Sequence, residues 1–197
     1  MLSSIQQAPV KARSVTYMKY LSISLILILT LLSCKSTAIS VDPTGETYAV
    51  INQVLKGEKS QKLVEKSLTQ QTAYRSTRHQ NFEDYFDYTF LNLNPLVRED
   101  GSKIDFRTLL TQEELSALKR KSSNLKEVKF SRRFLDKSVR LVKKRNEKSI
   151  SLSLPIFTSN RKFAFVFLES SSGASLLCYK KMGTDWKLFS VNTIWIS

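Results

Sequence analysis

From residue 139 onward the chain is a series of short apolar segments separated by turn residues, and this pattern restricts the fold most. Residues 163–168 are apolar at every position, which is typical of a central strand covered on both faces. Turn residues at 170–173 and at 183–185 lead into strands expected over 174–181 and 186–196. Short turns between consecutive strands predict an antiparallel meander in the C-terminal half.

Two further segments precede this meander. Residues 139–142 are followed by a polar turn at 145–148, and Ile150, Leu152 and Leu154 come after it. These apolar residues alternate with Ser149, Ser151 and Ser153. Strict alternation predicts a strand with one buried face and one wet serine face. We expect the two segments to form a hairpin with the basic turn at its tip.

Helix signals lie in the N-terminal half. Asp42-Pro43 is a typical helix start, and the following apolar spacing predicts a helix through Lys56 that stops at Gly57. Thr111 and Glu114 have the spacing of a capping box, and Leu115 and Leu118 follow on one face, with an end expected near 122–124. We therefore predict one α+β domain over 42–197, with N-terminal helices packed on one face of the meander.

The middle of the chain is less regular. Leu63, Val64 and Leu68 are compatible with a helix or with a short strand. An aromatic group follows, and we expect it to belong to the core: Phe82, Tyr85, Phe86, Tyr88 and Phe90.

The N-terminus has the organisation of an export signal. Residues 1–17 are polar and irregular, and we interpret them as an overlong N-terminus with Met18 as the true start. Lys19 then precedes a short apolar run over 21–32. A basic segment followed by such a run is typical of a signal peptide, here 18–33. The run is shorter than the roughly 20 residues of a membrane-spanning helix.

The motif Leu31-Leu32-Ser33-Cys34 ends this run. It resembles the lipobox of bacterial lipoproteins, and palmitate and diacylglycerol on the cysteine are what this resemblance implies. Cys34 would then be the lipidation site and 34–41 a lipidated tether. The resemblance implies attachment to the cell membrane or the outer membrane, outside the cytoplasm. Lys35 and Ser36 carry no acidic retention signal, which favours the outer membrane.

The terminal strands support the same assignment. The segments Leu154-Pro155-Ile156-Phe157, Phe163-Ala164-Phe165 and Trp195-Ile196-Ser197 resemble the ends of small envelope lipoproteins of unknown function. This resemblance implies a fold type and a location, but no activity.

The net charge of +14 is concentrated in residues 119–148, which hold thirteen Lys and Arg against Glu127, Asp136 and Glu147. The interpretation without a binding role is a solvated surface. The functional one is contact with anionic lipid or acidic glycan, because nucleic acid is a poor partner outside the cytoplasm. We name as anion-contact residues Lys143, Lys144, Arg145, Arg132 and Arg133. The first three should be exposed, and one of the last two should lie over apolar surface.

Catalytic and metal-binding patterns are weak, and we predict no catalytic residue, metal or cofactor. His79 is the only histidine, and Glu83, Asp84 and Asp87 are its nearest carboxylates. We expect a polar rim of the aromatic group there, with an envelope hydrolase as the alternative. Trp186 and Trp195 are expected in the core, and the alternative is that they form a platform for a glycan. Cys178 is expected to be a buried, inert thiol.

The sequence thus favours a non-enzymatic envelope lipoprotein, a binding or assembly module that also contacts an envelope protein. An inhibitor or immunity lipoprotein is a further alternative.

Overall fold

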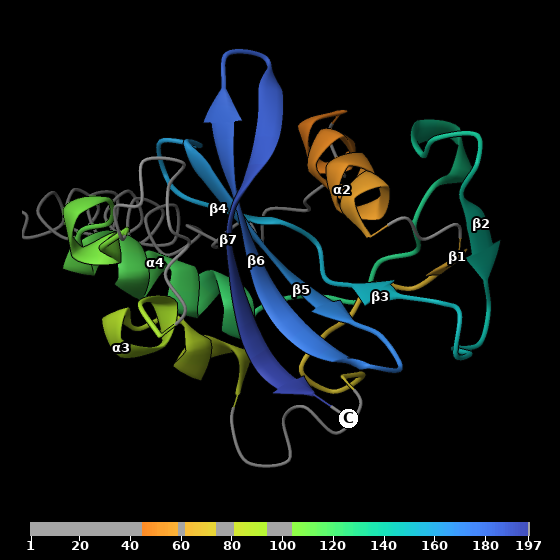
Figure 1. The fold of residues 1–197 in the computed structure, drawn as a ribbon, viewed down its shortest axis with the longest axis horizontal. Coiled ribbons are helices and arrows are strands. Elements are labelled where there is room, and N and C mark those ends of the chain that lie inside the picture. The colour runs from red at the N-terminus through yellow and green to blue at the C-terminus, as the bar shows by residue number, and fades with distance from the viewer. Residues whose placement is uncertain (1–44, 59–61, 74–80, 94–103, 197) are drawn as a thin grey trace, which may run out of the picture. The chain divides into compact units, whose positions relative to one another are not determined.

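The computed structural model describes residues 45–58, 62–73, 81–93 and 104–196 (Figure 1). The chain divides into two compact units, Met1–Asp42 and Pro43–Ser197, and every described residue lies in the second. The predicted start of the first helix at Asp42-Pro43 is outside the described residues, as are the signal peptide and Cys34.

A five-stranded antiparallel sheet forms the C-terminal half, with the order β3-β5-β6-β7 and with β4 also paired to β5. Its strands are β3 (Ser151–Leu152), β4 (Ile156–Phe157), β5 (Phe163–Glu169), β6 (Gly173–Met182) and β7 (Asp185–Ile196). Gly183 turns β6 into β7 with a φ of 63°, which favours glycine. The predicted α+β class and the antiparallel meander are confirmed.

Strand β5 lies at the centre and is buried along its whole length. Its side chains alternate between two hydrophobic clusters because successive residues of a strand point to opposite faces. Ala164, Val166 and Leu168 belong to the first cluster, whereas Phe163, Phe165 and Phe167 belong to the second. The apolar run over 163–168 therefore serves two cores at once.

Helix α2 (Gly45–Gly57) covers the first face of the sheet and buries Val50, Ile51 and Val54 there. An N-terminal helix thus packs on one face of the sheet, but the helices do not all share that face as expected. The helical segments that follow it cover the other face, so Figure 1 shows α2 and α4 on opposite sides of the sheet. These segments are η1 (Phe82–Tyr85), α3 (Tyr88–Leu91), η2 (Phe106–Thr108) and α4 (Gln112–Ser123).

The predicted aromatic core is confirmed on this second face. The ring of Phe82 stacks on that of Phe167 with a centroid distance of 3.9 Å, and Phe86 meets Phe165 edge-on at 5.3 Å. Tyr85 is buried as well. Rings in these geometries gain about 1 kcal/mol beyond the area they bury, so they fix η1 on the sheet.

Helix α4 has the predicted bounds and the predicted apolar face, with Leu115 and Leu118 buried. The Thr111 side chain accepts a hydrogen bond from the backbone N–H of Glu114, which is one half of the expected capping box. The Glu114 carboxylate accepts from the backbone N–H of Ser159 and so ties α4 to the turn between β4 and β5.

The predicted hairpin between 139–142 and 150–154 is wrong. Strand β2 (Arg140–Val142) pairs in parallel with β1 (Lys62–Val64), which enters from a distant part of the chain. The β1 strand also bridges Ile150 in parallel, so it separates β2 from β3. Of the two possibilities for this segment, Leu63 and Val64 form a strand.

The predicted wet face of serines is also wrong, since Ser149, Ser151 and Ser153 are all buried. Ser153 lies between Leu68, which follows β1, and strand β5. Its hydroxyl accepts a hydrogen bond from the backbone N–H of Phe167. A serine hydroxyl is small and can form its hydrogen bonds with neighbouring backbone groups, so burying it costs little free energy here.

Candidate anion-contact surface

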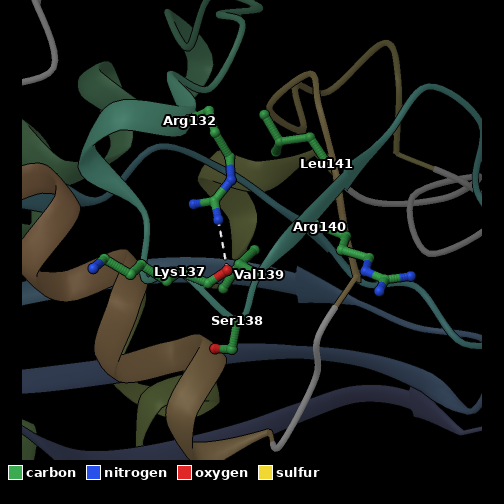
Figure 2. Close-up of a pocket in the computed structure, with 6 residues that line it drawn as sticks. All are labelled: Arg132, Lys137, Ser138, Val139, Arg140 and Leu141. Carbon is green, nitrogen blue, oxygen red and sulfur yellow. Dashed lines mark hydrogen bonds between the residues drawn. The ribbon is translucent and has the colours of Figure 1, made fainter.

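The segment from Arg132 to Leu141 surrounds an open groove on the surface of the folded unit. Its lining consists of Arg132, Lys137, Ser138, Val139, Arg140 and Leu141, which join η3 (Arg132–Phe134) to β2 (Figure 2). Lys137 and Arg140 extend away from each other, so their charges lie along the groove and do not converge on one point. Neither residue is among the predicted anion-contact residues, because nothing in the sequence distinguishes them within the basic stretch.

Arg132 organises this segment. Its guanidinium donates hydrogen bonds to the carbonyl oxygens of Leu135, Asp136 and Lys137 at 3.1, 2.9 and 2.6 Å. These carbonyls lie just beyond the end of η3, where the backbone has no further helical partner. Arg132 therefore holds the backbone of 132–137 in a tight turn.

Arg133 and Phe134 form the next feature. The guanidinium carbon of Arg133 lies 4.3 Å from the centre of the Phe134 ring, as expected for one of the two arginines. Tyr48 of α2 lies against the same ring, with a centroid distance of 4.9 Å. Phe134 is 38% exposed, although it is a large apolar residue.

The connection between β2 and β3 carries the other predicted contact residues. Lys143 and Lys144 are exposed, as predicted. Arg145 is only partly exposed, so that part of the prediction is wrong. Its Nη1 lies 2.9 Å from Oε1 of Glu169, whose side chain is 2% exposed, and its Nη2 donates to the carbonyl of Ser170. Arg145 is a structural cation rather than a free surface charge.

Carboxylates neutralise only part of the basic stretch. Lys129 pairs with Glu65 at 3.6 Å, and Glu127 pairs with Lys66 at 2.7 Å. Among the described residues, no carboxylate lies within 4.0 Å of the charged groups of Arg133, Lys137, Arg140, Lys143 and Lys144. These five cations are all exposed. Lys148 is likewise exposed and without such a carboxylate, and with these five it carries the charge that a partner can reach.

The start of the basic stretch lies elsewhere on the fold. Lys119, Arg120 and Lys121 belong to the end of α4, a helix that Figure 1 shows on the other side of the sheet from α2. The Nζ of Lys121 donates to the carbonyl of Phe157 in β4 at 2.7 Å. Burial of the Lys121 ammonium lowers its pKa, and the nearby charges of Arg161 and Arg120 lower it further. The charge of Glu114 raises this pKa but does not outweigh the other effects. The candidate surface is therefore confined to 132–148.

Of the carboxylates considered as partners of His79, Asp84 and Asp87 have structural roles, whereas Glu83 is a half-buried residue of η1. Asp84 accepts from the backbone N–H of Asn81 at 2.7 Å, and Asp87 accepts from that of Phe90 at 2.8 Å. Both thus satisfy the free backbone donors at the start of short helical segments. His79 itself lies outside the described residues. No cluster of three metal-ligating side chains occurs in the described part of the chain.

The remaining candidates are accounted for by packing. Trp186 is buried in the first cluster and lies against Phe157, so it does not form a glycan platform. Trp195 is half-buried. Cys178 is buried, and this burial raises the pKa of its thiol well above the usual range, so the thiolate that would react is disfavoured.

Comparison with known proteins gives no assignment. No protein-family profile matches the chain, and neither a curated protein nor a solved structure matches it. Within the described residues, no helix is both long and apolar enough to cross a bilayer.

Proposed function

We propose that this chain is a bacterial envelope lipoprotein, attached to the cell membrane or outer membrane by lipid on Cys34. In this proposal its folded unit is a non-enzymatic binding module that faces away from the cytoplasm. The module uses its basic end, 132–148, to hold an anionic partner.

One observation carries the binding role. Five exposed cations of 132–148, Arg133, Lys137, Arg140, Lys143 and Lys144, have no carboxylate partner among the described residues. Figure 1 shows this segment around β2, at one side of the folded unit. Exposed charges of one sign at a single end attract an anionic surface and are solvated at low cost until it arrives. The lipidation role rests on Leu31-Leu32-Ser33-Cys34 at the end of the apolar run.

Metabolic labelling with a fatty-acid analogue tests the anchor. The Cys34→Ala variant should lose all lipid label and accumulate as an unprocessed or mislocalised precursor. Cys178→Ala is the matched control, because it removes the other cysteine and leaves the lipobox intact, so it should retain the label. A Cys34→Ala chain that fractionates with membranes at the size of the wild-type mature form contradicts the proposal.

A further inference from the structure

We propose that the segment 132–140 docks the folded unit onto the anionic lipid surface in which the protein is anchored, with Phe134 at the level of the lipid headgroups. This inference rests on the proposed function and names the partner of the same basic end. The segment contains one acidic residue, Asp136, and four cations: Arg132, Arg133, Lys137 and Arg140.

The position of the segment favours the membrane. It is fixed on the first and middle turns of α2: Ser131 donates its backbone N–H to the Tyr48 hydroxyl at 2.6 Å, and Asn52 donates to the carbonyl of Phe134 at 3.0 Å. Asn52 also accepts from the backbone N–H of Asp136 at 3.2 Å. Helix α2 begins at Gly45, so the segment lies beside the first helical turns after the tether.

The length of the tether limits how far the segment can be from the bilayer. Ten residues, 35–44, separate Cys34 from Gly45. A chain of this length spans at most about 35 Å when fully extended. An anchor at Cys34 therefore keeps the segment at a high effective concentration next to lipid, so contacts too weak to hold a free protein suffice here.

The chemistry of the segment favours an extended anionic surface over a small ion. Lys137 and Arg140 extend in opposite directions (Figure 2), and the guanidinium of Arg132 already donates to three backbone carbonyls. A small anion needs donors that converge on it, whereas a layer of lipid phosphates presents many charges side by side.

The environment of Phe134 favours lipid over acidic glycan as the partner. Arg133 and Tyr48 both lie against its ring, so much of the aromatic surface is already in contact within the protein. A sugar stacks best on an aromatic face that is free of such contacts. Insertion of an apolar edge between headgroups needs no open face, and the arginine over the ring keeps its charge in the polar layer.

Thiol accessibility on the anchored, full-length chain tests the docking. Ser138 lines the groove and Ser159 lies in the turn between β4 and β5; both are exposed, and Ser→Cys at either site changes no charge. With Cys34 acylated and Cys178 buried, the new cysteine is the thiol open to a membrane-impermeant maleimide. The protein is reconstituted into phosphatidylcholine vesicles with or without phosphatidylglycerol.

We expect Ser138→Cys to react about tenfold more slowly in the anionic vesicles than in the neutral ones, while Ser159→Cys reacts equally in both. Adding Arg133→Glu, Lys137→Glu and Arg140→Glu to the Ser138→Cys chain should remove the protection. The matched reversals Lys119→Glu, Lys162→Glu and Lys187→Glu make the same change in net charge at exposed sites elsewhere and should leave it.

Equal reaction of Ser138→Cys in both vesicles overturns the docking proposal. So does loss of protection with the matched reversals, because net charge alone would then explain it. Protection by a soluble acidic polysaccharide, but not by the anionic vesicles, assigns the surface to glycan instead. A chain that neither vesicle retains contradicts the lipid anchor, which is a separate failure.

Discussion

At the scale of single residues, Arg145 determines how the basic connection between β2 and β3 is held. Its guanidinium pairs with the buried Glu169 at the end of β5, and the hydroxyl of Ser171 donates to the carbonyl of Glu147 at 2.9 Å. The connection is thereby fixed to the turn between β5 and β6. Lys143 and Lys144 are presented from a backbone with a defined position.

Arg145→Ala should lower the free energy of unfolding by about 3 kcal/mol, because it leaves the Glu169 carboxylate buried without this cation. Lys144→Ala, one residue away and exposed, should change it by less than about 0.5 kcal/mol. Urea denaturation of both variants measures the difference. Equal stability of the two would show that Arg145 is no more than a surface charge.

The sequence could not distinguish these neighbouring cations. Lys143, Lys144 and Arg145 share charge, local polarity and turn context, so all three were expected to be exposed. What separates Arg145 is Glu169, a carboxylate from another strand that only the tertiary fold brings close. The lining roles of Lys137 and Arg140 were missed for the same reason.

At the scale of elements, one carboxylate fastens α2 to the sheet. Glu46 in the first turn of α2 lies 2.5 Å from both Arg161 and Lys181, which come from the turn before β5 and from β6. Burial raises the pKa of the Glu46 carboxyl, but hydrogen bonds and charges from Lys181 and Arg161 outweigh it. The pKa is therefore held below its usual value of 4.5.

Glu46→Gln should destabilise the protein by about 1 kcal/mol at neutral pH, as expected for a partly exposed pair of ion pairs. A lowered pKa in the folded state means that the stabilisation is present above pH 4.5 and is lost as the pH falls through the folded value. The stability curves of wild type and variant should therefore converge in acid. Glu113→Gln, an exposed control on α4, should follow the wild type throughout. A difference that persists unchanged in acid contradicts this ion-pair explanation.

Which elements were predictable depends on how local their determinants are. The Thr111 cap, the leucines of α4 and the continuous apolar run of β5 act within a few residues, so their patterns predicted the elements. The pairing of β1 with β2 joins residues 62–64 to 140–142, and no local pattern specifies such a partner. The burial of Ser151 and Ser153 also depends on distant residues, because Ser151 lies opposite Glu169 of β5 and Ser153 bridges Leu68.

At the scale of the whole molecule, the sheet separates two hydrophobic clusters that share β5 and β6. Leu177 and Tyr179 pack with α2, whereas Leu176 and Cys178 pack with the helical segments on the other face. The unit Pro43–Ser197 thus contains its own core on both sides and is expected to fold without the N-terminal unit.

The last prediction concerns the basic end in the absence of the anchor. A soluble chain of residues 35–197 contains the entire second unit. We expect it to bind phosphatidylglycerol vesicles weakly at low ionic strength and to be released at physiological salt, because exposed charges are screened within about 8–10 Å there. Vesicle co-sedimentation across a salt series measures this.

Reversal of Lys143 and Lys144 to Glu should weaken the low-salt binding at least about 25-fold, since each cation near an anionic surface contributes about fivefold in affinity. Arg145 stays unchanged in this variant because its loss would also destabilise the fold. Lys162→Glu with Lys187→Glu is the control with the same net charge, and its binding should fall much less because both side chains lie outside 132–148. If both double variants bind equally, the chain responds only to its net charge, and the basic end is then a solvated surface without a partner of its own.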